Sequence, residues 1–271
     1  MKTLTIQDIS CYGQCSITVA LPILSSYGIE TVILPSAILS THTTNFKNYT
    51  VLDLTSEMPK IINHWINEKI SFDAIYTGYI SDVKQFDIIL KCKNMLLKEN
   101  GLFIVDPAMA DNGKLYPALK ADIIDGMKQI CKKADYIIPN ISEACFLCDY
   151  PFKEKYDDEY INDLLVKLVE NGYKNIILTG VIKKDKIGAI YFNGLDKISY
   201  FSKKEDKSFH GTGDVFSSIV IANILNHKPI KECLKSAVDF IKDCIKETQD
   251  DPSHHYGVKF EKVLLKQKKQ G

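Results

Sequence analysis

The sequence predicts an α/β fold with a mostly parallel sheet covered by helices on both faces. Two observations support this prediction. Short runs rich in β-branched residues alternate with longer segments of helical spacing, and the order is strand, helix, strand, helix through most of the 271 residues. Strands joined in this order need right-handed crossovers, and these place helices on both faces of the sheet.

The strands are expected at short apolar runs rich in Val, Ile and Thr, because such residues suit a buried, pleated surface. These runs are Leu4–Ile6, Thr31–Leu34, Ala74–Thr77, Leu102–Val105, Tyr136–Ile138 and Ile176–Thr179.

Helices are predicted where apolar residues recur at i, i+3, i+4 and i+7. One stripe runs from Ile161 to Val169 and ends at Asn171-Gly172, a C-cap signal, and another runs from Ile230 to Ile245. A small and apolar helix is expected over Val215–Leu225.

The pattern changes late in the chain. Ala189–Phe192 and Ile198–Phe201 are separated by Asn193-Gly194, which predicts an antiparallel hairpin. The stretch Lys203–Lys207 that follows is expected to be an exposed, mobile loop. Because there is no internal repeat, low-complexity linker or break in composition, we expect a single domain over residues 1–271.

The charge composition argues against nucleic-acid binding. All 34 basic residues are lysines and are balanced by 34 Asp and Glu, so the formal net charge is zero and there is no arginine to read guanine. A phosphate group would have to be held by backbone amides, lysines and metal ions. No apolar run approaches the ~20 residues of a membrane span. With no export signal at the N-terminus, the protein is expected to be cytoplasmic.

The eight cysteines are therefore expected to be reduced. Cys145 and Cys148 form a C-x-x-C where a helix is expected to start, but no second pair exists. Since zinc needs further ligands at matching spacing, they are interpreted as core thiols.

Ligands of open α/β sheets bind beyond the carboxyl ends of the strands, and polar residues follow several predicted strands there. The most informative segment is His210-Gly211-Thr212-Gly213-Asp214, just before the predicted helix Val215–Leu225. Its glycines allow a tight turn and close approach to a ligand, and free amides at a helix start attract an anion. Asp214 either complements the helix dipole or accepts a proton from a hydroxyl held beside the anion.

Three other loops carry candidate residues. Asp106 and Asp111 lie in a loop rich in turn-forming residues. The loop is either a plain turn, or its two carboxylates face a metal ion bound to phosphate. Asn140 and Glu143 have the spacing of a capping box and could also organise magnesium and its waters. Asp8, after the first strand, could meet the polar edge of a substrate. There is no G-x-S-x-G, no P-loop motif and no G-x-G-x-x-G after the first strand, which weakens acyl-transfer, P-loop and dinucleotide interpretations.

Together these motifs resemble the ribokinase-like superfamily and, within it, the vitamin B6 (pyridoxal, pyridoxine, pyridoxamine) kinases. Gly211-Thr212-Gly213-Asp214 is similar to the superfamily signature. Further segments are similar to motifs of the B6 kinases in the same order: Ile6-Gln7 to Tyr12-Gly13, Ser40-Thr41-His42-Thr43, Thr77-Gly78-Tyr79, Asp106-Pro107 with Asp111, and Pro139-Asn140 with Glu143.

The resemblance implies a three-layer α/β/α fold with a central mainly parallel sheet, a homodimer, and transfer of the γ-phosphoryl of ATP to the 5′-hydroxyl of a B6 vitamer. It makes Asp214 the base and Gly211, Thr212 and Gly213 the phosphoryl site. The reference pKa of aspartate, ~3.9, predicts that Asp214 is ionised at neutral pH. The other implied roles fall into two groups. The nucleotide and Mg²⁺ are assigned to Asp106, Asp111, Asn140, Glu143, Thr179 and Gly180, with Asp111 and Glu143 toward the metal. A monovalent cation such as K⁺ is an optional second ion. The vitamer is assigned to Asp8, Ser10, Tyr12, His42, Thr43 and Tyr79.

Some residues depart from the family pattern. Asp8 stands where the better-known members have serine, and a carboxylate there would favour a protonated ring nitrogen or an amino group. Cys15, Ala110 and Thr179-Gly180 also differ. These departures leave the preferred vitamer open and keep hydroxymethylpyrimidine phosphorylation as an alternative. A non-catalytic nucleotide or vitamer sensor is the other alternative, although a sensor has no need to keep Asp214, Asp111 and Glu143 together.

Overall fold

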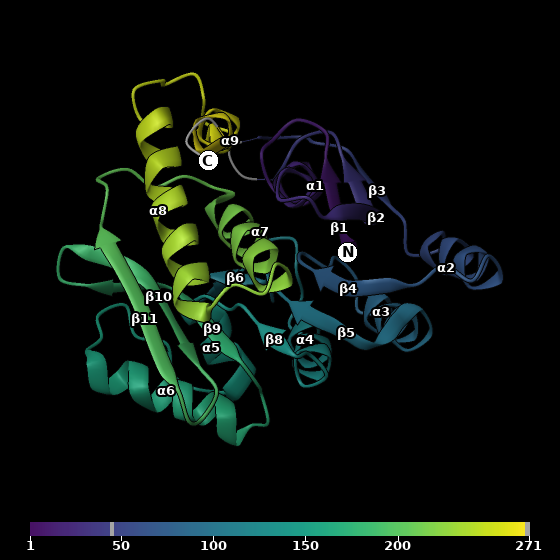
Figure 1. Ribbon diagram of the computed structural model, residues 1–271, viewed down its shortest axis with the longest axis horizontal. Coiled ribbons are helices and arrows are strands. Elements are labelled where there is room, and N and C mark those ends of the chain that lie inside the picture. The colour runs from purple at the N-terminus through teal and green to yellow at the C-terminus, as the bar shows by residue number, and fades with distance from the viewer. Residues whose placement is uncertain (44–45, 269–271) are drawn as a thin grey trace.

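The computed structural model describes residues 1–43 and 46–268. Within this part of the chain a nine-stranded sheet has the order β11-β10-β9-β8-β5-β4-β1-β2-β3 (Figure 1). Its strands are β1 Lys2–Ser10, β2 Glu30–Leu39, β3 Val51–Asp53, β4 Phe72–Thr77, β5 Leu97–Val105, β8 Tyr136–Ile137, β9 Ile176–Lys183, β10 Lys186–Phe192 and β11 Lys197–Lys203. Neighbours from β2 to β9 are parallel, whereas β3, β10 and β11 pair antiparallel. The predicted mostly parallel sheet is confirmed.

Helices cover both faces of the sheet, so the three-layer prediction is also confirmed (Figure 1). One core cluster contains side chains of α1, α7, α8 and α9, and the other contains those of α2 to α6. The helices are α1 Ile17–Ser26, α2 Met58–Asn67, α3 Lys84–Leu96, α4 Ile123–Cys131, α5 Ile141–Cys148, α6 Asp158–Glu170, α7 Thr212–Leu225, α8 Ile230–Thr248 and α9 Phe260–Lys268. A small hairpin of β6 Ala110–Asp111 and β7 Lys114–Leu115 lies outside the main sheet.

The helices predicted from apolar stripes are present. In α6 the stripe residues from Ile161 to Leu168 are buried, and the Asp157 side chain caps the start by accepting a hydrogen bond from the Tyr160 amide at 2.9 Å. In α8 the stripe residues from Cys233 to Val238 are buried in the same way, whereas Ile230, Ile241 and Ile245 are half-buried. Burial of a one-sided stripe against the sheet is what stabilises both helices.

The late hairpin is confirmed as β10–β11, but it is part of a larger antiparallel unit. β9 does not end at Thr179; it continues to Lys183 and pairs antiparallel with β10. Gly180, with φ +68°, lies between the pairs Leu178–Ile190 and Val181–Gly188, where the register of β9 and β10 shifts. The extension depends on pairing with a later strand, so apolar periodicity alone does not reveal it.

One local prediction was wrong. The C-x-x-C lies in the second half of α5, because this helix begins at Ile141, immediately after its cap Asn140. Cys145 and Cys148 are buried there as free thiols, as expected for core residues.

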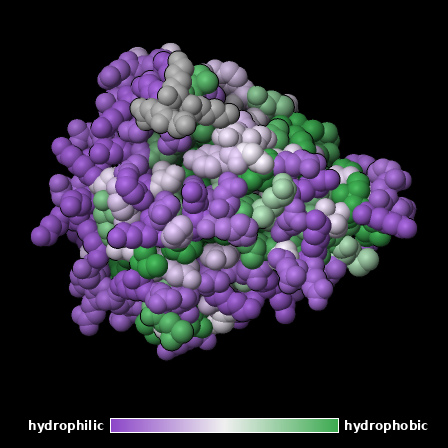
Figure 2. Space-filling view, in the orientation of Figure 1, coloured by the Kyte–Doolittle hydropathy of each residue, from purple (hydrophilic) through white to green (hydrophobic). Residues whose placement is uncertain are grey.

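Helix α7 passes through the middle of its layer, between α1 and α8, and every residue from Val215 to Leu225 is buried. Its small apolar side chains suit this position. Its N-terminus lies at the carboxyl ends of the central strands, where the candidate residues gather. The outer surface is mostly hydrophilic, with hydrophobic residues in small separate groups on the face drawn in Figure 2. None of the described helices is long and apolar enough to cross a bilayer.

Candidate active site

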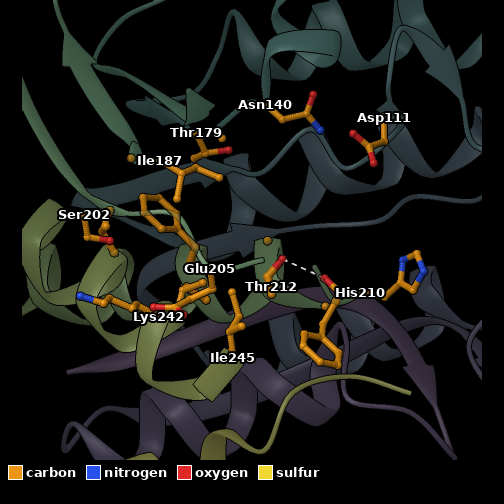
Figure 3. A pocket seen from close by; sticks show the side chains of 18 of the residues that line it. Asp111, Asn140, Thr179, Ile187, Ser202, Glu205, His210, Thr212, Lys242 and Ile245 are labelled. Carbon is orange, nitrogen blue, oxygen red and sulfur yellow. Dashed lines mark hydrogen bonds between the residues drawn. The ribbon is translucent and has the colours of Figure 1, made fainter. Parts of the chain in front are cut away.

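The glycine motif forms the start of α7. Gly211 is the N-cap with φ +76°, and a Cβ added to it would lie 2.1 Å from the carbonyl oxygen of Gln14. The Thr212 hydroxyl donates to the carbonyl of Phe209 at 3.1 Å, which is the dashed bond in Figure 3. The first amides of a helix have no partner within the helix. The motif therefore presents amide donors and the positive end of the dipole to the adjoining cavity.

This cavity has a volume of about 300 Å³ and collects most of the residues assigned to the nucleotide (Figure 3). The segments that follow β5 and β8, together with Thr179 and Gly180 of β9, supply one end of it, and the start of α7 supplies another part. The sequence-predicted residues that line it are Asp111, Asn140, Thr179, Gly180, Gly211, Thr212 and Gly213. Asp106, Glu143 and Asp214 are not among the lining residues.

An apolar part of the cavity wall was not predicted, and it adjoins polar side chains that include Lys203, Glu205 and Lys242. Ile187 comes from β10, Phe216 from α7, and Val238, Ile241 and Ile245 from α8. The stripe of α8 is visible in the sequence, but a stripe looks the same whether it packs on a sheet or lines a ligand slot. A slot that is apolar at one end and lined by amides at the other suits a flat base joined to phosphates.

Asp214 lies in the first turn of α7 and is half-buried. Burial raises the pKa of Asp214 to about 7, and the carboxylates of Asp106 and Asp8 add to the rise, while a hydrogen bond from the Ser16 amide lowers it. The expectation of an ordinary pKa was therefore wrong, because the residues that desolvate and repel this carboxylate are far away in sequence. A carboxyl group that titrates near neutrality is suited to proton transfer.

Asp106 and Glu143 lie deeper than the cavity. Asp106 accepts a hydrogen bond from the Ser217 hydroxyl at 2.6 Å, and burial raises the pKa of Asp106. Glu143 is 3 % exposed, and burial followed by repulsion from Asp106 raises its pKa well above the usual range. Because no described lysine pairs with either acid, this acidic group lacks a positive partner from the chain.

The capping box of Asn140 and Glu143 is confirmed. Asn140 accepts from the Glu143 amide at 3.0 Å, and Glu143 accepts from the Asn140 amide at 2.8 Å and from the Met109 amide at 3.1 Å. The Asn140 side chain also donates to the carbonyl of Ala110 at 2.8 Å. These bonds fix the β6–β7 hairpin, which carries Asp111, against the start of α5.

Among the sequence-predicted acids, Asp111 is the one that lines the cavity and could hold a magnesium ion shared with phosphates. Asp111 is exposed and turns its carboxylate to the cavity beside Asn140 (Figure 3). Among residues 1–43 and 46–268, no three His, Cys, Asp or Glu side chains gather closely enough to hold a metal ion by themselves. Mg²⁺ usually takes one or two carboxylates together with waters and substrate phosphates. It would also offset the charge of Asp106 and Glu143.

The residues assigned to the vitamer lie outside this cavity, on the β1 side of Asp214. Asp8 is 4 % exposed and accepts from the Ser10 hydroxyl at 3.0 Å; burial raises the pKa of Asp8, and hydrogen bonds from the Ser16 and Ser10 hydroxyls lower it. Burial, and then the Asp8 carboxylate, raise the pKa of Tyr79 to about 12. Asp8, Ser10 and Tyr79 are thus brought together near Asp214.

The other vitamer candidates lie at the rim. The ring of Tyr12 is 5.8 Å from Phe46, and the ring of His42 is 5.3 Å from Phe46 and 6.1 Å from His210. His210 immediately precedes Gly211, so these rings adjoin the glycine motif. Thr43 is exposed next to His42.

Some residues around the site were missed by sequence reasoning. Ser16 reaches both Asp8 and Asp214 and has φ +51°, which is unusual for a residue other than glycine. Tyr116 lines the cavity, and burial and the surrounding acids Glu143, Asp106 and Asp214 raise its pKa. Ser217 lies one turn after Asp214 and holds Asp106. Single serines and tyrosines carry no pattern of their own, so only their contacts reveal them.

Comparison with known proteins agrees with this geometry. The chain is 26 % identical to the pyridoxal kinase of Dictyostelium discoideum, over 92 % of this chain and 87 % of that protein. A protein of Bacteroides thetaiotaomicron VPI-5482, assigned provisionally to the phosphomethylpyrimidine kinases and crystallised with pyridoxal, superposes with a TM-score of 0.91 at 32 % identity, covering 98 % of this chain and 94 % of that one. Pyridoxal kinase from Lactobacillus plantarum superposes with a TM-score of 0.89 at 26 % identity, covering 97 % and 95 %.

These relatives confirm the resemblance to B6 kinases and the ribokinase-like fold. The family model described as phosphomethylpyrimidine kinase matches residues 20–259, which is most of the chain and includes both the cavity and the glycine motif. The chain therefore belongs to the phosphomethylpyrimidine kinase family.

Proposed function

We infer that the protein is an ATP-dependent kinase that phosphorylates the 5′-hydroxyl of a B6 vitamer (pyridoxal, pyridoxine or pyridoxamine). One observation carries this inference: Asp214 lies between the amide-lined cavity and a group formed by the buried Asp8 and Ser10 and the half-buried Tyr79. The cavity has the shape and polarity for a nucleotide on one side of this carboxylate. The acceptor alcohol would lie on the other side. Curated and structural relatives named as pyridoxal kinases support the same acceptor class.

The proposed chemistry is an in-line displacement at the γ-phosphorus. The vitamer 5′-oxygen forms a bond to that phosphorus while the bond to the bridging oxygen of ADP breaks. Asp214 orients the hydroxyl and accepts its proton as the new bond forms. The amides at Gly211 to Gly213 face the transferred group, where fixed donors stabilise the charge that develops on its oxygens.

Magnesium is part of the proposal, with Asp111 as a direct or water-mediated ligand and Glu143 organising its waters. When bound, the ion would neutralise phosphate charge that this arginine-free chain cannot meet with a guanidinium group. We also propose, on the family resemblance, that residues 1–271 act as one cytoplasmic kinase domain in a homodimer, with K⁺ as a possible second cation. Sedimentation of the purified protein would measure the dimer directly.

A second acceptor, hydroxymethylpyrimidine, has the support of the family description itself. Both acceptors are flat heteroaromatic alcohols. The decisive experiment measures ADP release with pyridoxal, pyridoxine, pyridoxamine and hydroxymethylpyrimidine, each with and without Mg²⁺. We expect magnesium-dependent ADP release that is fastest with a B6 vitamer. ADP release with hydroxymethylpyrimidine alone would make that compound the acceptor in place of a B6 vitamer. No ADP release with any of the four compounds would favour the non-catalytic sensor.

The pH dependence of turnover follows from Asp214. Its pKa is raised to about 7, so the free protein holds a neutral carboxyl group below that pH, and a neutral carboxyl cannot accept the proton. We expect kcat/KM for the vitamer to rise about tenfold per pH unit below this pKa and to level off above it. Measurements from pH 5.5 to 8.5 at constant ionic strength would test this. A profile that is flat across that range would show that Asp214 titrates at its ordinary value or takes no part.

A further inference from the structure

Aromatic rings outside the two hydrophobic core clusters gather beside the glycine motif. We call Tyr12, His42, Phe46, His255 and Tyr256 the ring cluster. Tyr12 lies 4.7 Å from Tyr256 and 5.8 Å from Phe46 between ring centroids, and Phe46 lies 5.4 Å from His255. None of the five belongs to either core cluster, and Tyr12 is 50 % exposed. Tyr12 and His255 are exposed, Phe46 and Tyr256 are half-buried and His42 is buried, so the cluster lies at the boundary between the surface and the interior.

The C-terminal part of the chain contributes to this surface. Tyr256 and His255 belong to the loop between α8 and α9, more than two hundred residues after Tyr12, and this loop contacts the segment that precedes α1. The loop has its own internal bonds. Asp251 pairs with Lys259 at 2.5 Å and accepts from the Ser253 amide at 3.0 Å. These bonds lie within the loop and stabilise its conformation independently of its contacts with other segments.

Gln14 ties this loop to the β1–α1 segment. Its backbone amide donates to the Tyr256 carbonyl at 2.8 Å, and its side-chain nitrogen donates to Glu261 at 2.6 Å. Its side-chain oxygen lies 2.8 Å from the ring nitrogen of His254. Gln14 thus holds the loop at His254 and Tyr256, and it holds the start of α9 at Glu261.

Gln14 also touches the catalytic motif. A Cβ on Gly257 would lie 2.4 Å from the Cβ of Gln14, and a Cβ on Gly211 would lie 2.1 Å from its carbonyl oxygen. Gln14 is therefore packed between the C-terminal loop on one side and the N-cap of α7 on the other. Any displacement of the loop would reach both the ring cluster and the glycine motif.

We propose that Tyr256 forms one wall of the acceptor site and that Gln14 is the positioning residue that holds it there. The acceptor class that this wall suits is a flat heteroaromatic alcohol, whose ring can pack against the faces of Tyr12 and Tyr256 while its hydroxyl reaches Asp214. This inference rests on the proposed function, because the proposed function is what places the acceptor on the Asp8 side of Asp214. The inference adds the loop between α8 and α9 to the acceptor site, whereas all the sequence motifs lie before that loop in the chain.

The test compares Tyr256→Leu, Tyr256→Phe and Gln14→Ala with Lys262→Ala, an exposed α9 residue, as the matched control. Tyr256→Leu should raise the KM and the Kd for pyridoxine by about 2- to 12-fold, the range for loss of one aromatic pair. Tyr256→Phe should keep both within about twofold, because the ring face remains. The KM for ATP should stay unchanged in all four variants.

A double-mutant cycle separates positioning from general loosening. If Gln14 acts through Tyr256, then Gln14→Ala combined with Tyr256→Leu should weaken pyridoxine binding no more than the stronger single change. Additive effects, an equal rise in the KM for ATP, or a Kd for Tyr256→Leu within twofold of the wild type would each overturn the proposal. Pyridoxine binding is measured by titration independently of turnover. A wild type that binds pyridoxine without releasing ADP would therefore reject the kinase function and still test Tyr256, whereas a wild type that does not bind it would reject both.

Discussion

Replacing Asp214 by asparagine is expected to lower kcat by roughly 10²–10⁴-fold, the usual worth of general-base assistance. Asparagine keeps the size and the hydrogen-bonding reach of the side chain but cannot accept the proton of the acceptor hydroxyl. The KM values for ATP and for the vitamer should change little, because the cavity walls and the residues around Asp8 remain. Steady-state measurement of ADP release with both substrates varied would separate kcat from KM.

The same substitution should stabilise the protein at high pH. The folded-state pKa of Asp214 is about 7, above its unfolded value near ~3.9. The folded state therefore holds an extra proton between these values, and the free energy of unfolding falls as pH rises through that window. Asp214→Asn removes this cost, so its free energy of unfolding should exceed that of the wild type at pH 8, by up to about 4 kcal/mol, and match it near pH 4.

Asp206→Asn is the matched control for these measurements, since Asp206 is exposed in the loop after β11. It should leave both turnover and stability unchanged. Near-normal turnover in Asp214→Asn would remove Asp214 from the role of base. If the difference in the free energy of unfolding between the wild type and Asp214→Asn does not change with pH, the raised pKa of Asp214 is contradicted instead. The role of Asp214 as base and its raised pKa are therefore tested separately.

Replacing Gly211 by alanine is expected to have the second largest effect. The added methyl group would lie 2.1 Å from the backbone oxygen of Gln14, and the residue has φ +76°, where side chains are disfavoured. Backbone on one side and a fully packed helix on the other leave little room to adjust. We expect a loss of about 2–4 kcal/mol in the free energy of unfolding, in the range for strain combined with overpacking. We also expect a fall in kcat of about 10²-fold, because displaced amides no longer face the phosphoryl group.

Gly28→Ala is the control that separates the cost of a positive φ from the cost of the steric clash with Gln14. Gly28 has φ +79°, similar to Gly211, but a Cβ there meets nothing within 4 Å. Its loss of stability should be about 1 kcal/mol, with normal kcat. Thermal or urea unfolding and ADP release would be measured on both variants. Equal losses of stability in the two variants would mean that Gln14 shifts at little cost to make room for the methyl group. A normal kcat in Gly211→Ala would mean that catalysis does not depend on the position of these amides.

Much of the fold was predictable because it is encoded locally. Strand runs and helix stripes reflect the periodicity of burial, and the order of these elements leaves few topologies for a mostly parallel sheet. The capping box of Asn140 and Glu143 and the glycine-opened start of α7 depend on hydrogen bonds within a few residues, so their spacing identifies them. The prediction was less accurate where a boundary depends on a distant partner, as in the continuation of β9 along β10.

The candidate site divides in the same way. The sequence by itself determined which residues carry the chemistry: Asp214, the glycines before it, and the acids after β5. Only the tertiary structure decided that Asp214 lies among Asp106, Asp8 and Ser16, and that the C-terminal loop reaches Gln14. The physical reason is that a pKa depends on desolvation and on charges a few ångströms away. A pocket wall likewise depends on which segments pack together, and neither is written in the spacing of residues along the chain.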